Sequence, residues 1–496
     1  MALEFFLAKN SSKSAKANGV ALHSAYNPQV EGERFAQSLQ LDFNPKCIVI
    51  LEGALSYCAP FIKKRFPLAK VGTIRFVQDF SQFDKEWDFA LALDDKGLFD
   101  YFGEEALFQT AFFDWKPSAA AWPEQNKKAW TQIKEATLKA KTVLATREYF
   151  GKRWLKNKVS FFNHINKAAI IKQIQKPVLI CASGPSLEGA LESIKKARDK
   201  IFVCALSSAA SVLAWNKIEP DLVLSSDGGW WAKKHLAPLR TVFKSVPLAL
   251  EAESACPAIL LRQKQILPLC YDDDFISQRV FEALGVQCVT TRRNGTVSGS
   301  ALELFLSLCE KEIYFAGLDL APSSKKSHAL PNVLETERDA ADFRLRTKAT
   351  RQAASSLASE SLKIYQDWFE AYDLKGRSVY RIKGQEDFSN TLGQIKDIDA
   401  KDFESRLQKT NNDDCEQKDY FEFNDAAKGM AQKQRQKKIK NIFLEWTKSE
   451  SFCQELFPAD TIMLRRAALE QEKLERKKII ERKKAELVQK LFGGPK

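Results

Sequence analysis

The sequence contains no apolar run that approaches the length needed to cross a lipid bilayer, which is about 20 residues. Its first residues, MALEFFLAKNSSKSAK, also lack the basic segment, the long apolar segment and the small-residue cleavage site of a secretory signal. From these absences we expect a cytoplasmic protein without stable membrane insertion.

Closely spaced cysteine pairs are absent as well. No CxxC pair occurs, and several cysteines stand inside apolar segments such as CIVIL and VLICAS, where a free thiol behaves as a small hydrophobic group. We therefore expect buried thiols, and neither a disulfide framework nor a zinc site. The ten cysteines are Cys47, Cys58, Cys181, Cys204, Cys256, Cys270, Cys288, Cys309, Cys415 and Cys453.

The length of the chain indicates the number of domains, and its net charge indicates the kind of partner. A chain of 496 residues is too long for a single hydrophobic core and indicates two or three domains. The formal net charge of +13 suits an anionic partner: a nucleic acid, an anionic membrane or an anionic small substrate. Because the basic residues are spread along the chain and densest near its end, we expect no dedicated nucleic-acid interface.

Short apolar segments alternate with helical segments over the first 400 residues, which predicts an α/β fold with a parallel sheet. We divide the chain into an N-terminal α/β domain (1–150), a catalytic domain with a central doubly wound, mostly parallel sheet (151–400) and a helical, basic C-terminal region (401–496). The strands expected are Cys47–Leu51, Val71–Val77, Asp88–Leu93, Pro177–Ala182, Ile201–Leu206, Asp221–Ser226, Val246–Leu250, Gln265–Leu269, Gln287–Thr290 and Glu312–Ala316.

The C-terminal region is rich in Lys, Arg, Glu and Gln. No proline occurs between Pro458 and Pro495, so Asp460–Phe492 is expected to form one long helix. Its apolar residues do not keep a heptad repeat, which disfavours a coiled coil. Two interpretations stay open: a solvated helix packed along one stripe, and a basic arm that docks a partner protein.

In a doubly wound sheet, ligands bind outside the carboxyl ends of the strands, so we searched there for chemistry. The strand ending at Ala182 runs into Ser183, Gly184, Pro185 and Ser186. A glycine allows close backbone approach, and the amides at the start of the next helix attract an anion such as phosphate. The other glycines of a dinucleotide-binding turn and the lysine of a P-loop are missing, which argues against NAD and Walker-type ATP sites.

Three further segments follow predicted strands. Asp227 precedes two glycines, and it suits either a ligand crevice or an ordinary turn. Arg292–Ser298, which contains Asn294, Gly295 and Thr296, opens a predicted helix, and its polar groups suit a phosphate or a carboxylate as well as a solvated surface.

The third segment is Gly317–Leu320, which contains Asp319 and is followed by His328. Only four histidines occur in the chain. An imidazole titrates near neutral pH and can serve as a general base, although a loop histidine can also be a simple surface residue.

These segments occur in the order found in one family. GPSL at 184–187, PDLVLSSD at 220–227, NGTVSGSALEL at 294–304 and EIYFAGLDLA at 312–321, with His328 after them, resemble the central domain of the motility accessory factor (Maf) glycosyltransferases. That domain is similar to bacterial sialyltransferases. LHSAYNP at 22–28, followed by Glu31 and Arg34, resembles the opening of Maf proteins, and GRSVY at 376–380 resembles a short strand after their central domain.

The resemblance implies transfer of a nonulosonic acid, such as pseudaminic or legionaminic acid, from its CMP-activated form to serine or threonine of flagellin. It implies that Gly184–Ser186 cradle the CMP phosphate, that Asp227 and Asp319 line the donor site, and that His328 is the candidate base. Sialyltransferases carry asparagines where this chain has Ser183 and Ser207 or Ser208, so the nucleotide contacts are expected to differ.

The donor would thus be a substrate, with no tightly bound cofactor, and the need for a divalent metal stays open. Flagellin would be the protein partner, and the modification would serve flagellum assembly and motility.

Two alternatives remain. One is an archaeal-type pterin diphosphokinase on the same central domain, which would use ATP, Mg²⁺ and the carboxylates of Asp227 and Asp319. The other is a non-catalytic flagellin-binding assembly factor.

Overall fold

The computed structural model describes residues 3–93, 97–321, 326–351, 360–383, 390–408, 419–426 and 430–493. The chain divides into two compact units, one made of Met1–Lys152 with Thr447–Lys496 and the other of Arg153–Trp446. Of the region that we predicted as 401–496, the part up to Trp446 thus belongs to the second unit and the rest to the first. None of the helices in the described ranges combines the length and the apolar character of a membrane span.

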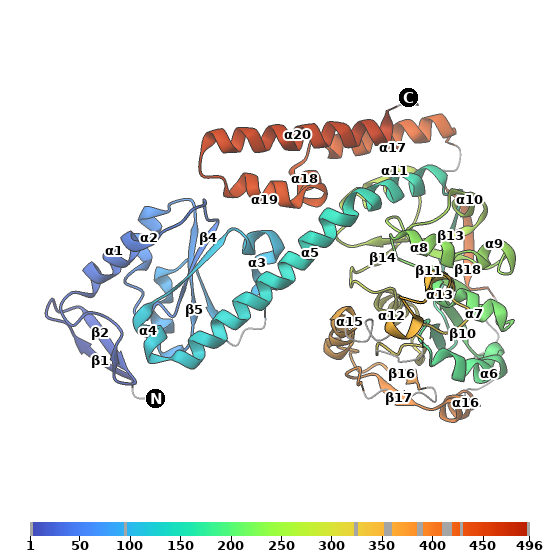
Figure 1. The fold of residues 1–496 in the computed structure, drawn as a ribbon, viewed down its shortest axis with the longest axis horizontal. Coiled ribbons are helices and arrows are strands. Elements are labelled where there is room, and N and C mark those ends of the chain that lie inside the picture. The colour runs from blue at the N-terminus through green and yellow to red at the C-terminus, as the bar shows by residue number, and fades with distance from the viewer. Residues whose placement is uncertain are drawn as a thin grey trace. The chain divides into compact units, whose positions relative to one another are not determined.

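The first unit holds two sheets (Figure 1). An antiparallel sheet contains β1 (Leu3–Leu7), β2 (Lys13–Ala17) and β3 (Val20–Ala21), which the sequence did not lead us to expect. A parallel sheet has the order β6-β5-β4-β7, with β4 at Cys47–Leu51, β5 at Lys70–Arg75, β6 at Phe89–Ala92 and β7 at Thr110–Asp114. All five residues of β4 are buried, which agrees with its uninterrupted apolar sequence CIVIL.

Helices surround the parallel sheet of the first unit. They are α1 (Pro28–Ser38), α2 (Ala59–Arg65), the 3₁₀ helix η1 (Gln78–Glu86), α3 (Leu98–Leu107), α4 (Lys116–Ala121) and α5 (Pro123–His164), whose residues belong to both units. The motif LHSAYNP leads into α1: Asn27 caps the helix through its side chain, and Pro28 is its first residue.

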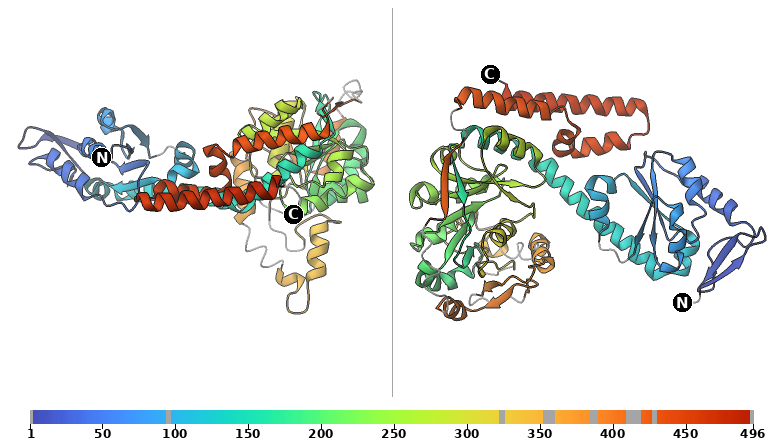
Figure 2. Two further views of the ribbon diagram at one scale, coloured as in Figure 1. Left: turned by 90° about the horizontal axis from the view of Figure 1, so that it is seen from above. Right: turned by 180° about the vertical axis from the view of Figure 1, so that it is seen from behind.

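The end of the chain folds into α18 (Glu450–Leu456), α19 (Pro458–Arg466) and α20 (Glu470–Phe492). The prediction of one helix over Asp460–Phe492 is therefore wrong, because the backbone leaves the helical conformation between Ala467 and Leu469. α19 and α20 lie side by side (Figure 2). Ile480 and Leu487 of α20 are buried, as expected for a helix that packs along one apolar stripe.

The second unit contains the large sheet, whose order is β17-β16-β15-β9-β10-β11-β12-β13-β8-β18, with β14 paired to β13. All its pairings are parallel except that of β18 with β8. The strands are β8 (Lys167–Ile171), β9 (Val178–Cys181), β10 (Phe202–Leu206), β11 (Leu222–Ser225), β12 (Leu248–Glu251), β13 (Gln265–Tyr271), β14 (Val289–Thr291), β15 (Ile313–Ala316), β16 (Val379–Ile382), β17 (Lys396–Ile398) and β18 (Phe421–Asp425).

Helices connect these strands and cover the sheet (Figure 1). They are α6 (Leu187–Ala197), η2 (Arg198–Lys200), η3 (Ser207–Ala209), α7 (Ala210–Trp215), α8 (Trp230–His235), α9 (Pro238–Thr241), α10 (Ala258–Gln263), α11 (Phe275–Leu284), α12 (Val297–Leu308), α13 (Val333–Ala341), α15 (Glu360–Ala371), α16 (Ala400–Gln408) and α17 (Gln432–Trp446). The fold prediction is confirmed: a central doubly wound, mostly parallel sheet, a smaller α/β sheet domain and a helical end.

Strand order in the large sheet marks where a ligand site is expected. From β9 the chain adds β10, β11, β12, β13 and β14 on one side, and it then returns to place β15 on the other side of β9. The direction of winding therefore reverses between β9 and β15. Such a switch point is where open α/β sheets bind ligands, outside the carboxyl ends of the strands.

All nine cysteines in the described ranges are free thiols, and seven of them are buried. Burial raises the pKa of Cys58 and Cys181 to about 12. A thiol with so high a pKa is a poor nucleophile near neutral pH. The prediction for Cys415 concerns a residue outside the described ranges.

The helical hairpin at the end of the chain can be tested by a pair of substitutions in α20. Ile480 is 5% exposed and Leu474 is 54% exposed. Ile480→Ala should lower the free energy of unfolding by about 2–4 kcal/mol, because it leaves a cavity between packed helices. Leu474→Ala should change it by less than about 0.5 kcal/mol. Denaturant unfolding measures both, and equal small effects would contradict the hairpin.

Candidate functional site

Two loops meet at the switch point of the large sheet. The turn Ala182–Ser186 follows β9, and Gly317–Leu320 follows β15. The Ala182 amide donates to the Ala316 carbonyl and the Gly184 amide to the Gly317 carbonyl, both at 2.8 Å. The two turns that the sequence singled out separately are thus hydrogen-bonded to one another.

Asp319 binds the turn directly. Its side chain accepts a hydrogen bond of 2.9 Å from the Ser186 amide and another from the Ser186 hydroxyl, and the residue is only 7% exposed. The positive end of the helix dipole also stabilises a carboxylate at the first turn of α6. Asp319 was predicted to line the donor site; in the structure it holds the loop that precedes α6.

Gly184 is required by this contact. A Cβ atom at Gly184 would lie 2.5 Å from the Gly317 oxygen and 2.6 Å from a carboxylate oxygen of Asp319. Gly317 has a φ of +76°, and a Cβ there would lie 2.4 Å from the Ala182 oxygen. Replacing Gly184 by valine would therefore disrupt the joined loops, so such a variant cannot test phosphate binding by itself.

The amides of the turn already have acceptors. The Ser186 amide donates to Asp319, and the amides of Leu187, Glu188 and Gly189 donate to carbonyls within the turn at 3.0–3.2 Å. α6 begins at Leu187, so Pro185 precedes the N-cap residue, Ser186. A phosphate cradle formed by Ser183, Gly184, Pro185 and Ser186 stays a prediction, and it would require these hydrogen bonds to be exchanged.

Two further polar side chains donate hydrogen bonds to the loop after β15. Arg381 of β16 is fully buried and donates to the Leu318 carbonyl at 3.4 Å and to Asp397 at 2.7 Å. The Asn390 side chain donates to the Asp319 carbonyl at 2.8 Å. This support could not be predicted from the sequence, because Arg381 lies in a short strand far along the chain.

His328 lies beside the joined loops. The amide of the next residue, Ala329, donates to the Ser183 carbonyl at 2.8 Å, and the Leu330 amide donates to Glu188 at 2.8 Å. His328 Nδ1 lies 2.9 Å from Oε1 of Glu335, and the His328 side chain is 26% exposed. The structure thus brings the predicted base to the predicted turn.

The loop after β10 is part of the same edge. Ser207 is buried and Ser208 is partly exposed in η3. The Ser208 carbonyl accepts a hydrogen bond of 3.3 Å from the side chain of Asn332, which is 1% exposed. This bond connects the segment that carries His328 to the loop that holds Ser207 and Ser208.

Asp227 follows β11 and is exposed. Its side chain accepts from the Gly229 amide at 2.7 Å, which is the bond of an ordinary Asp-Gly turn. His235, in the helix that follows, was not singled out from the sequence. Burial lowers the pKa of His235, the charge of His328 lowers it further, and the charge of Asp227 raises it. His235 therefore lies within electrostatic reach of both His328 and Asp227.

The segment after β14 uses its polar groups to start α12. Thr296 caps the helix by accepting from the Gly299 amide at 2.8 Å. Asn294 accepts from the Thr296 amide at 3.2 Å and donates to Glu303 at 3.3 Å, while Gly295 has a φ of +78°. A direct ligand contact by these three residues stays a prediction.

A buried ionic network lies where β12 and β14 end. Arg293 forms a two-bond pair with Glu253 at 2.7 and 3.0 Å, and Lys158 lies 3.1 Å from Glu253 and 2.9 Å from Asp274. These cations hold the pKa of Glu253 at about 2 despite its burial. Arg293 is thus engaged internally, whereas Arg292 is 77% exposed.

Glu251 lies within electrostatic reach of Glu253 and Arg293 of this network. The residue is 1% exposed, and its side chain accepts from the Thr291 hydroxyl at 2.6 Å. Burial is the main cause that raises the pKa of Glu251 to about 8. The folded protein therefore carries Glu251 mainly protonated at neutral pH.

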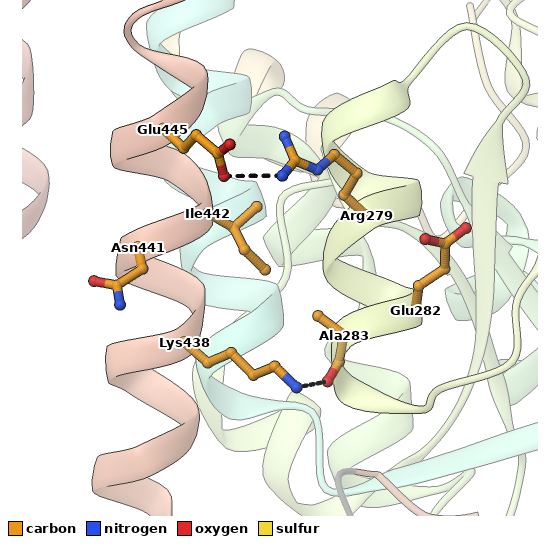
Figure 3. A pocket seen from close by; sticks show the side chains of 7 residues that line it. All are labelled: Arg279, Glu282, Ala283, Lys438, Asn441, Ile442 and Glu445. Atoms are coloured by element: carbon orange, nitrogen blue, oxygen red, sulfur yellow. Dashed lines mark hydrogen bonds and ion pairs between the residues drawn. The ribbon is translucent and has the colours of Figure 1, made fainter.

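Cavities of the second unit lie away from the joined loops. One of about 490 Å³ separates α11 from α17, where Arg279 pairs with Glu445 at 2.9 Å and Lys438 donates to the Ala283 carbonyl at 2.6 Å (Figure 3). Another cavity, of about 390 Å³, lies near the starts of β10, β11 and β12. Its lining includes Glu219, Asp221 and Tyr420. No predicted site residue lines either cavity, so the site is defined by its polar groups.

Comparison with known proteins extends these observations. The sequence model of the family described as 6-hydroxymethylpterin diphosphokinase MptE-like matches residues 152–325. A curated protein of Treponema pallidum (strain Nichols), described as an uncharacterized protein, is 30% identical over 295 residues. The matched stretch is 58% of this chain and 62% of that protein, so the chain spans less than two thirds of its relative.

Among solved structures, the chain is similar to the Maf glycosyltransferase from Magnetospirillum magneticum AMB-1. The TM-score is 0.57 with 13% sequence identity, and the alignment covers 98% of this chain and 90% of that one. The chain therefore has the fold of a Maf glycosyltransferase over nearly its whole length.

The protonation of Glu251 predicts a pH-dependent stability. Because its pKa is about 8 in the folded protein and near 4.5 when exposed, ionisation in the unfolded chain lowers the free energy of unfolding as pH rises from about 4.5 to about 8. Glu251→Gln removes this loss. The variant should match wild type near pH 4.5 and exceed it by up to about 4 kcal/mol at pH 8.

Denaturant unfolding across this pH range measures the effect. Glu192→Gln, at a side chain that is 77% exposed, controls for removal of a carboxylate from the surface. A difference between Glu251→Gln and wild type that does not grow with pH would show that Glu251 is ionised in the folded protein.

Proposed function

We propose that the chain is a glycosyltransferase that transfers a nonulosonic acid of the pseudaminic or legionaminic type from its CMP-activated form to serine or threonine hydroxyls of flagellin. The observation that carries the proposal is the convergence of the loops after β9, β10, β11 and β15 at the switch point, with His328 among them. The Maf-like fold of nearly the whole chain supports the same assignment.

The polar groups at this edge suit the chemistry of such a transfer. The acceptor hydroxyl attacks the anomeric carbon, the bond from that carbon to the CMP phosphate breaks, and CMP leaves with the electron pair. His328 would take the proton of the hydroxyl, a contribution of about 10²–10⁴-fold to the rate. Asp319 would act by holding the turn of Ser186 in place, since both its oxygens are bonded there.

A pterin diphosphokinase is the second candidate, and the family match over 152–325 favours it. It would transfer a diphosphate from ATP with Mg²⁺ held by carboxylates, for which the sequence offers Asp227 and Asp319. Asp319 suits this role less well, because Ser186 occupies its oxygens and the residue is buried. The likeness to a Maf glycosyltransferase also extends across the first unit, which that family match does not reach.

One set of assays separates the candidates. The purified chain is incubated with flagellin and CMP-pseudaminic or CMP-legionaminic acid, and separately with ATP, Mg²⁺ and hydroxymethylpterin. Release of CMP with a matching mass increase of flagellin supports the glycosyltransferase. Release of AMP supports the pterin enzyme, and binding of flagellin with neither product supports a non-catalytic assembly factor.

Replacement of His328 tests the proposed base. His328→Ala should lower the single-turnover rate by about 10²–10⁴-fold, because no base is then positioned to receive the proton of the attacking hydroxyl. Affinity for the CMP-sugar should change by less than about twofold, because a neutral imidazole adds little to the binding of an anion. Calorimetry and rapid-quench kinetics on the same variant give both quantities.

His164→Ala is the matched control, since His164 ends α5 and its ring contacts Ser160. A wild-type rate in His328→Ala would remove His328 from the reaction. A large loss of donor affinity would assign it to donor binding instead.

The C-terminal helix offers a test of flagellin docking. Deleting residues 426–496 would remove α17, whose Arg435 donates to the Phe162 carbonyl at 2.9 Å, and would therefore damage the fold. A milder change neutralises exposed cations of α20 by Lys477→Gln, Lys478→Gln and Arg482→Gln. If α20 docks flagellin, the KM for flagellin should rise about tenfold at low salt, with the effect fading at high salt.

Hydrolysis of the CMP-sugar without flagellin is the control for this variant and should not change. An unchanged KM for flagellin would mean that α20 serves the fold alone. Equal loss of hydrolysis and transfer would mean that the substitutions disturb the catalytic unit.

A further inference from the structure

Glu335 is a buried carboxylate at the edge of the joined loops, and the sequence analysis assigned it no role. The residue is 1% exposed in the first turn of α13. One carboxylate oxygen lies 2.9 Å from Nδ1 of His328. The other is buried and has no hydrogen-bond partner among the described residues. Burial of a carboxylate costs free energy unless hydrogen bonds or charges offset that cost, so the burial of Glu335 calls for a structural or functional explanation.

The position of Glu335 is set by the start of α13. Asn332 caps the helix, accepting from the Leu334 amide at 2.9 Å and from the Glu335 amide at 3.4 Å. The same side chain donates to the Ser208 carbonyl in the loop after β10. Glu335 is therefore fixed relative to the sheet, whereas His328 belongs to a loop and is a quarter exposed. The carboxylate is the fixed partner and the imidazole is the one that it orients.

The hydrogen bond also decides which ring nitrogen carries the proton. A carboxylate only accepts hydrogen bonds, so Nδ1 of His328 must donate to it. A neutral imidazole has one N–H, and with the proton on Nδ1 the lone pair stays on Nε2. Nε2 is then the nitrogen that can accept a proton from a hydroxyl.

We propose that Glu335 is a positioning residue for His328, which holds the ring and keeps its proton on Nδ1. This inference rests on the proposed function. When the acceptor hydroxyl attacks the donor, its proton passes to Nε2 of His328 and the ring becomes an imidazolium. The Glu335 carboxylate stabilises that charge without taking a proton itself.

The tautomer can be observed without any substrate. The chain has four histidines, so ¹⁵N-histidine labelling gives few signals, and His328→Ala assigns the one of interest. Long-range ¹H–¹⁵N correlation at about pH 8, where histidines are mostly neutral, reports which nitrogen is protonated. We expect the Nδ1–H form in wild type. A proton on Nε2 of wild-type His328 would overturn the proposal.

Glu335→Gln keeps the shape of the side chain but offers an N–H donor that can pair with an unprotonated Nδ1. The Nε2–H form should therefore increase in this variant. The transfer rate should fall by about 10²–10⁴-fold with donor affinity within twofold, and Glu335→Asp should restore part of the rate. Glu337→Gln, on the same helix at a residue that pairs with Lys234, is the matched control.

Thermal unfolding shows whether each variant folds, and Glu335→Asp keeps the test usable if Glu335→Gln does not. If His328→Ala is slow while Glu335→Gln keeps both the wild-type tautomer and the wild-type rate, the positioning role is overturned and the proposed function stands. If His328→Ala itself retains the wild-type rate, His328 is not the base and the proposed mechanism fails with it.

Discussion

The contact between Gly184 and the Gly317–Asp319 loop is the constraint on which the candidate site depends. The two loops follow strands that adjoin in the sheet, although the last paired residues of these strands, Cys181 and Ala316, are 135 positions apart in the sequence. Only a glycine at each contact lets the two backbones come this close, and Asp319 then closes the junction through Ser186.

The rest of the edge is attached to this junction. The segment that carries His328 is bonded to the Ser183 carbonyl in the turn and to Glu188 in the first turn of α6. Asn332 extends the attachment to the loop after β10. A change that opens the junction would therefore move the predicted base together with the turn, so effects on binding and on rate are separable only by substitutions outside it.

Most of the fold could be predicted because its strands are nearly uninterrupted apolar segments, as parallel strands buried on both faces must be. All ten predicted strands are found within two residues of their expected ends. Among the missed strands, β1 has no buried residue, β2 is largely polar, and β17 contains only three residues, KDI. The break between α19 and α20 contains no glycine or proline, so the sequence does not indicate it.

The site was predictable only as far as strand ends reveal it. The turns after β9, β11 and β15 stand out because small and acidic residues follow apolar strands, yet the partners of those residues come from distant segments. Asn332 followed three residues later by Glu335 is a pattern that starts a helix, so the sequence could have located α13. It could not show that the buried carboxylate faces His328, because that depends on the loop bonded to Ser183.

The structure also separates the polar residues of the motifs into two groups. Asp319, Asn294 and Thr296 have their hydrogen bonds satisfied within the fold, where they join loops or start a helix. His328 and Asp227 keep exposed surface at the same edge of the sheet. Because the first group is bonded within the fold, we infer that it sets the geometry of the edge, and we propose that the second group acts on a substrate. The order of motifs along a sequence does not distinguish the two groups, because both are polar residues that follow strands.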